Sequence, residues 1–238
     1  MKKVLFATLV LITFSNSQQY YIDCVGSSIT RNGYPGVTNN LMIDNNYIWR
    51  VHNYGVPGAG VIQNAYKDTS VYDEVISRKA EIIVLLLGAN DWQWYSVADQ
   101  DGKDKWESEY RKLIDEFQKF STVILGYLIH RVSVGGNDVS LANATMDEMN
   151  LIIDDIASDY GLTIIDFKTA IGTNPAHFWA SDGLHPNSLG SEKMGIAAYE
   201  HLTKYYYLSI DDEYLEAVED YNNQKPALFN GCSMKRVN

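Results

Sequence analysis

Five apolar segments, separated by longer amphipathic or polar stretches, set the pattern of this chain. Each predicts a buried strand, because it is rich in β-branched, aliphatic or aromatic residues and ends at glycine or polar residues. The predicted strands span residues 20–25, 50–54, 81–87, 122–129 and 162–167. The third segment, EIIVLLL, is apolar almost throughout, so we expect it to be covered on both faces of the sheet.

Apolar residues between these strands recur at the spacing of helices. The clearest predicted helices span 106–120, 146–160 and 189–207, with a shorter one inside 32–47. Strands that alternate with helices predict an α/β fold, with a parallel sheet covered by helices on both faces. The 238 residues are enough for one sizeable domain with a well-buried core.

The first 17 residues differ from the remainder. Lys2 and Lys3 precede an apolar run at 4–14 and small polar residues at 15–17, which is the order of a secretory signal peptide. The alternatives are a buried first strand or a membrane anchor, although the run is too short to span a bilayer. We therefore expect a secreted protein with a signal peptide over 1–17, one domain over 18–208, and an acidic C-terminal extension over 209–238 that includes a helical stretch at 211–221.

Charge and cysteine content exclude several classes of partner. The chain carries a formal charge of −11, and removal of the two leader lysines would leave 17 basic against 30 acidic side chains, or −13. Such a surface repels nucleic acid and anionic membranes, so we expect neither nucleic-acid binding nor stable membrane insertion. Cys24 is expected to be a buried thiol rather than the disulfide partner of Cys232. No spacing of cysteine and histidine predicts a metal site, and we expect no cofactor. Asn143 begins a glycosylation sequon.

Polar residues follow the predicted strands. Ser28 comes directly after the first strand, at the edge of the sheet where α/β proteins bind ligands, so its hydroxyl is a candidate nucleophile. The alternative is that Ser28 is only the N-cap of a helix. The glycine-rich turn at 55–60 follows the second strand; a phosphate-binding loop is its alternative, but the spacing is wrong and Pro57 removes one donor. Asn90 follows the third strand.

The loop ASDGLHP contains a second candidate pair, Asp182 and His185. In a tight loop the carboxylate of Asp182 can reach the imidazole and fix its tautomer, and His185 can then take the proton of Ser28. One alternative is a metal pair, which together with His177 would serve a metal-dependent phosphoesterase. Another is a turn aspartate beside an exposed histidine.

Four segments together resemble the diagnostic blocks of the SGNH hydrolases, also called the GDSL family of serine esterases: GSSIT at 26–30, NYGVPG at 53–58, LGAND at 87–91 and DGLHP at 182–186. The resemblance implies a three-layer α/β/α sandwich with a flavodoxin-like five-stranded parallel sheet. It also implies Ser28 as nucleophile, His185 as general base and acid, and Asp182 as its orienter. The backbone amides of Ser28 and Gly58 and the side-chain amide of Asn90 would form the oxyanion hole. The family usually has aspartate where this chain has Ser27.

The resemblance leaves the ester itself open, because members of the family hydrolyse acetylated sugars, lysophospholipids and aryl esters. Trp92 and Trp179 are predicted substrate-binding residues, since aromatic rings beside a cleft suit a sugar face; the alternative is that these rings, with Trp94 and Tyr95, cover the core. We expect a secreted serine esterase that acts on short acyl esters, acetyl above all, of carbohydrate. The alternatives are a lysophospholipase-like lipid esterase and a catalytically weak secreted binding protein.

Overall fold

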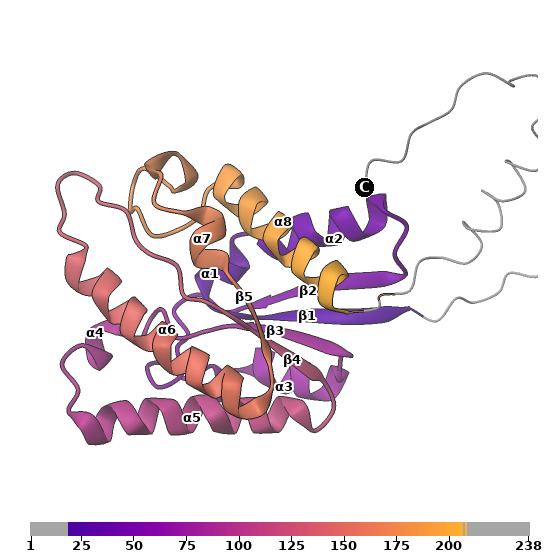
Figure 1. Ribbon diagram of the computed structural model, residues 1–238, viewed down its shortest axis with the longest axis horizontal. Helices are drawn as coiled ribbons and strands as arrows, with labels where there is room; N and C mark the ends of the chain where they lie inside the picture. The colour runs from indigo at the N-terminus through magenta and orange to yellow at the C-terminus, as the bar shows by residue number, and fades with distance from the viewer. Residues whose placement is uncertain (1–18, 207, 209–238) are drawn as a thin grey trace, which may run out of the picture.

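Five parallel strands form one sheet in the computed structural model, which describes residues 19–206 and 208 (Figure 1). Their spatial order is β2-β1-β3-β4-β5. The strands are β1 (Tyr20–Gly26), β2 (Trp49–Gly55), β3 (Ile82–Leu86), β4 (Thr122–Gly126) and β5 (Thr163–Ile165). This arrangement confirms the predicted α/β fold with a flavodoxin-like sheet.

Helices cover both faces of the sheet and make the fold a three-layer sandwich (Figure 1). One face carries α2 (Tyr34–Asp44), α7 (Phe167–Ile171) and α8 (Ser188–Tyr205), and the other carries α3 (Ser70–Arg78), α5 (Gln100–Gln118) and α6 (Ser140–Tyr160). Shorter turns lie in the loops: α1 (Ser28–Arg31), α4 (Trp92–Tyr95), and the 3₁₀ turns η1 (Tyr66–Asp68) and η2 (Pro175–His177).

The centre of the sheet is the centre of the core. All five residues of β3 are buried, as its uninterrupted apolar sequence predicted, and each such aliphatic side chain contributes about 1.5–3 kcal/mol by leaving water. The strand β1 lies between β2 and β3, and Gly26 at its end is level with both Gly55 and Leu86. The first three strands therefore end at one common edge, and the loops that follow them are held side by side.

Two predicted strands extend more than one residue beyond the observed carboxyl ends. The strand β4 ends at Gly126, because the backbone N–H and C=O of Leu128 bond to the side chain of Asn150 instead of to a neighbouring strand, at 2.8 and 3.0 Å. The strand β5 ends at Ile165, because the Asp166 carboxylate accepts the N–H of Thr169 at 2.9 Å and starts α7. In a sequence, buried apolar residues that follow the end of a strand cannot be distinguished from the strand itself.

The helices also differ from the prediction at several ends. The helices α5 and α6 each begin six residues before the predicted start, and the Asp99 side chain caps α5 by accepting the N–H of Gly102 at 3.0 Å. The helix α3 was not predicted at all, although Thr69 caps it through the N–H of Tyr72 at 3.2 Å. The helices α2 and α8 agree with the predicted segments to within three residues.

Several predictions fall outside the described residues: the signal peptide over 1–17, the extension over 209–238 with its helical stretch, and Cys232. The boundaries of the domain stay predictions. Cys24 is buried in β1, where burial raises the pKa of its thiol to about 12, and it forms no disulfide with any residue that the structure describes. Between residues 19 and 208 no described helix combines the length and the apolar character that crossing a bilayer requires.

Candidate active site

Ser28 stands just after the carboxyl end of the inner strand β1, as the first residue of α1. The turn before it requires glycine, because a Cβ on Gly26 would lie 2.4 Å from the carbonyl oxygen of Leu86. Ser27, rather than Ser28, occupies the N-cap position of α1, and its buried side chain makes no capping hydrogen bond. The Asn53 amide ties this short helix to β2 by donating to the carbonyl of Thr30 at 3.0 Å.

The structure brings Ser28, His185 and Asp182 together. The Oγ of Ser28 lies 2.9 Å from Nε2 of His185, and Nδ1 of the same ring lies 2.8 Å from Oδ2 of Asp182. Serine and histidine are 157 positions apart in the chain, so this contact exists only because the fold closes. The alternative in which Ser28 is the N-cap of a helix is wrong, because Ser27 holds that position.

The loop that carries Asp182 and His185 is built on its own hydrogen bonds. The other carboxylate oxygen of Asp182 accepts the backbone N–H groups of Leu184 and His185, at 2.8 and 3.0 Å. Gly183 has a φ of +61°, and a Cβ there would lie 2.1 Å from the carbonyl oxygen of Val132. Only glycine satisfies both the backbone conformation and this close approach.

The hydrogen bonds around Asp182 also decide its charge. Burial by itself would raise the pKa of its carboxyl, but the bonds from the His185 ring and from two backbone amides outweigh burial and lower the pKa below its usual value. Asp182 is therefore a carboxylate at neutral pH. An ionised acceptor in this position favours the proton on Nδ1 of His185 and leaves Nε2 free to accept from the Ser28 hydroxyl.

Gly58 and Asn90, the other two predicted oxyanion-hole residues, belong to the loops that follow β2 and β3. Gly58 is exposed and has a φ of +81°, a conformation that favours glycine. The side-chain nitrogen of Asn90 donates to the carbonyl of Ala59 at 2.8 Å, which fixes the orientation of the amide and links it to the Gly58 loop. The second N–H of the Asn90 side-chain amide takes no part in this hydrogen bond.

Asp91 is a site residue that the sequence reasoning missed. It is fully buried, and its carboxylate accepts the backbone N–H groups of Val61, Ile62 and Gln63 at 2.7, 3.1 and 2.7 Å and the indole N–H of Trp106 at 3.2 Å. Burial raises the pKa of Asp91 and outweighs these hydrogen bonds, which lower it. The signal was present, since LGAND places a second polar residue directly behind Asn90.

The predicted aromatic residues have different surroundings. Tyr95 is buried against Trp106, so for this ring the core-covering alternative is right. Trp179 is 55% exposed. Its backbone holds the 179–185 loop closed: its N–H donates to the carbonyl of His185, and its carbonyl accepts the N–H groups of Asp182 and Gly183. Trp92 lines a pocket of about 320 Å³ together with Asp182.

His177, the third residue of the metal-site alternative, does not join the other two. Its Nδ1 lies 2.6 Å from the carbonyl oxygen of Ile171, and its own backbone carbonyl accepts the N–H of Asn187. Within residues 19–206 and 208, no group of three histidine, cysteine, aspartate or glutamate residues is arranged to hold a metal ion.

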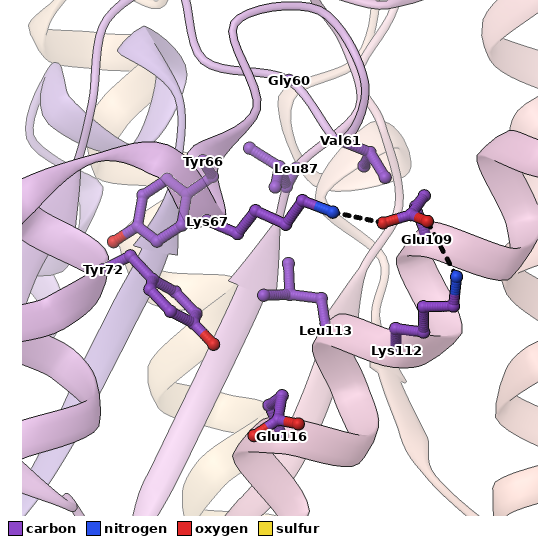
Figure 2. A pocket seen from close by; sticks show the side chains of 10 residues that line it. All are labelled: Gly60, Val61, Tyr66, Lys67, Tyr72, Leu87, Glu109, Lys112, Leu113 and Glu116. Carbon is purple, nitrogen blue, oxygen red and sulfur yellow. Dashed lines mark hydrogen bonds and ion pairs between the residues drawn. The ribbon is translucent and has the colours of Figure 1, made fainter.

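A second, smaller pocket of about 80 Å³ lies between η1, α3 and α5 (Figure 2). Tyr66, Tyr72 and Leu113 form much of its wall, and Lys67 bonds to Glu109 across its rim, as the dashed lines of Figure 2 show. Lys112 bonds to the same carboxylate, and the two lysines lower the pKa of Glu109 to about 2. Neither Ser28 nor His185 lines this pocket.

Solved structures of two esterases are similar to this chain and indicate its fold class. An acetylxylan esterase from Geobacillus stearothermophilus superimposes with a TM-score of 0.62 at 20% identity over 80% of this chain and 96% of that one. An M. smegmatis aryl esterase gives a TM-score of 0.62 at 13% identity over 79% of this chain and 100% of that one. These likenesses, with the sheet order above, define the fold as that of the SGNH hydrolases.

The family follows from the sequence match. The model of the GDSL-like lipase/acylhydrolase family matches residues 24–193, so the chain belongs to this family of carboxylic ester hydrolases. An acetylxylan esterase from Xylanibacter ruminicola is 26% identical over 207 residues, which cover 73% of this chain. The match covers 41% of the length of that curated relative, which is therefore much the longer protein.

Proposed function

We propose that this protein is a secreted serine esterase that removes short acyl groups, acetyl above all, from carbohydrate. The observation that carries the proposal is the chain of two hydrogen bonds, 2.9 and 2.8 Å long, from Ser28 through His185 to Asp182. Membership of an ester hydrolase family and the similarity to acetylxylan esterases support the choice of reaction and of acyl group. The leader-like residues 1–17 support export.

In the proposed mechanism the Ser28 hydroxyl attacks the ester carbonyl carbon, and Nε2 of His185 takes its proton. The negative charge that develops on the carbonyl oxygen is held by the backbone amides of Ser28 and Gly58 and by the free amide N–H of Asn90. Asp182 stabilises the imidazolium without itself taking the proton. His185 then gives the proton to the departing sugar oxygen, the C–O bond breaks, and Ser28 is left as its acyl ester.

Water completes the cycle. His185 takes a proton from a water molecule, which attacks the acyl-serine carbonyl, and the second collapse releases the carboxylic acid and returns the proton to Oγ of Ser28. No step requires a cofactor. The aspartate that the family usually has at the position of Ser27 takes no part in these proton transfers, so its replacement does not remove a group that the mechanism uses.

Hydrolysis of p-nitrophenyl acetate and p-nitrophenyl octanoate by the secreted form, beside its Ser28→Ala variant, tests this function. We expect the acetate to be the better substrate and the variant to lose at least roughly 10⁴-fold in kcat. A preference for octanoate would favour the lysophospholipase-like alternative. Equal and negligible turnover by both proteins would favour a binding protein, and reversion of Ser27 to aspartate would then be the first variant to make.

A further inference from the structure

The pocket that Trp92 lines is also lined by Asp182, the hydrogen-bond partner of His185. Its volume of about 320 Å³ falls within the range of small-molecule sites, roughly 300–1,000 Å³. The walls come from three regions: Trp92 just after the LGAND loop, Asp182 in the 179–185 loop, and the segment from Arg131 to Ala142. The 179–185 loop and the 131–142 segment touch through a hydrogen bond from the Val132 amide to the Gly183 carbonyl at 2.8 Å.

Among the residues that the structure describes, Arg131 is the one cationic side chain that lines this pocket. Its guanidinium lies over the Trp92 ring, 4.8 Å from the ring centre, and its Nε is buried with no hydrogen-bond partner in the described part of the chain. Loss of solvent lowers the pKa of Arg131, but an arginine remains charged at neutral pH. A buried guanidinium donor without an acceptor costs free energy, so hydrogen bonding of Nε within the described residues does not explain why the guanidinium is held here.

The fold holds Arg131 in this position independently of any ligand. The side-chain amide of Asn143 in α6 makes two hydrogen bonds to the backbone of Arg131: its oxygen accepts the N–H at 2.8 Å, and its nitrogen donates to the C=O at 3.0 Å. The stacking on Trp92 restrains the other end of the side chain. A donor that is fixed at both ends loses little entropy when it binds, which is the property of a recognition residue.

The acids in the pocket indicate what kind of ligand fits. Asp182 is occupied by His185 and by two backbone amides, and the exposed Asp138 accepts the N–H of Ser140 at 2.8 Å. Two carboxylates beside one guanidinium disfavour an anionic ligand. Neutral hydroxyl and ring oxygens accept from a guanidinium without adding negative charge, and an aromatic ring with a guanidinium above it presents a flat surface to a sugar.

The position of the pocket relates it to the ester. Trp92 is two residues after Asn90, and Asp182 is bonded to the base that serves Ser28. The pocket therefore shares Asp182 with the candidate catalytic residues, and Trp92 connects it to the loop that carries Asn90. We propose that Arg131, supported by Trp92, binds the sugar part of the ester and donates hydrogen bonds to the oxygen atoms of a neutral glycan. This proposal rests on the proposed function and makes Arg131 a specificity residue of the same site.

Two Arg131 variants measured on two substrates test the proposal. The readout is the ratio of kcat/KM for an acetylated neutral xylo-oligosaccharide to kcat/KM for p-nitrophenyl acetate. Loss of a charged hydrogen bond is expected to lower this ratio roughly 10- to 100-fold in Arg131→Met, mainly through KM. Arg131→Lys keeps the charge but loses the planar fork, so the ratio should fall less. Arg111→Met, which changes an arginine that pairs with Glu107 and Asp159 on the surface, is the matched control and should keep the wild-type ratio.

A variant that leaves Arg131 in place covers the case in which Arg131→Met fails to fold. Asn137 is exposed at the rim of the pocket, so Asn137→Trp should fill the pocket and lower the same ratio. An unchanged ratio in the folded variants, or an equal loss on both substrates, would overturn the proposal. A selective loss on acetylated glucuronides alone would overturn the neutral-glycan assignment. Failure of the proposed function is a different result, because the wild-type protein would then not hydrolyse the acetylated xylo-oligosaccharide at all.

Discussion

Two aspartates, Asp182 and Asp91, hold two loops at the same edge of the sheet and do so in opposite ways. Asp182 lies in a partly exposed loop, is bonded to an imidazole, and has a lowered pKa. Asp91 is completely buried, accepts four N–H groups, three from one backbone loop and one from an indole, and has a raised pKa. The difference teaches that an aspartate in a loop can be held for the proposed chemistry or for the scaffold, and that its hydrogen-bond partners distinguish the two.

Replacing Asp182 should have the largest effect on turnover and little effect on folding. Asp182→Asn cannot stabilise the imidazolium and disfavours the productive tautomer of His185, so we expect kcat to fall about 10⁴-fold. Thermal unfolding should stay within a few degrees of wild type, because the loop is partly exposed and keeps an acceptor at this position. A loss of folding without a specific loss of kcat would show that Asp182 belongs with Asp91 in the scaffold.

Removal of the Asn90 amide should have the next largest effect on turnover. One oxyanion-hole donor is worth roughly 10²- to 10³-fold in kcat, which is the loss expected for Asn90→Ala. The variant also loses the bond to the Ala59 carbonyl, which costs about 1 kcal/mol of unfolding free energy. Steady-state kinetics and urea unfolding separate the two effects. A change in KM with no change in kcat would argue against transition-state stabilisation by this amide.

Asp91→Asn should reverse the pattern of Asp182→Asn. An amide in place of the buried carboxylate puts a donor against backbone N–H groups, so we expect a loss of about 3 kcal/mol in the free energy of unfolding. Turnover should fall by a smaller factor than in Asp182→Asn, since Asp91 acts only by positioning the loop that carries Gly58. Urea unfolding of the two variants side by side checks this. Equal stability in both would remove the scaffold role assigned to Asp91.

The two aspartates should also give stability opposite pH dependences near their ordinary pKa of about 3.9. Asp182 binds its proton less tightly in the folded protein than in the unfolded chain. Its contribution to folding stability is therefore present above this pKa and is lost as pH falls. Asp91 binds its proton more tightly when folded, so its contribution declines as pH rises through the same region. Unfolding free energies of wild type and both variants between pH 3 and 6 should therefore diverge with opposite slopes. Parallel curves would contradict these pKa directions.

The smallest effect is expected for Asn143, whose amide holds the backbone of Arg131. Asn143→Ala removes two hydrogen bonds at a half-buried position and should cost about 1–2 kcal/mol of stability. It should also lower the ratio of glycan-ester to aryl-ester hydrolysis, by less than Arg131→Met does. A ratio that stays at the wild-type value in Asn143→Ala would show that Arg131 does not need the two hydrogen bonds from Asn143 to keep its position.

Much of the fold was predictable, because its signals are local. The buried strands are short apolar runs, and three of the four blocks place Ser28, Gly58 and Asn90 after strands that the sheet holds parallel. Where the prediction failed, the deciding contact was distant in sequence. Leu128 leaves the sheet because Asn150 satisfies its backbone, 22 residues later. Arg131 gave no signal, since the ring against which its guanidinium packs belongs to Trp92, 39 residues earlier in the chain.

Covalent labelling tests the central claim most directly. The protein is incubated with a fluorophosphonate, digested, and mapped by mass spectrometry, with Ser28→Ala and Asp182→Asn treated in parallel. The account predicts a single adduct on the peptide that contains Ser28 in the wild-type protein, much slower labelling in Asp182→Asn, and none in Ser28→Ala. Labelling of another serine, or esterase activity that survives in Ser28→Ala, would contradict the assignment of Ser28 as the nucleophile.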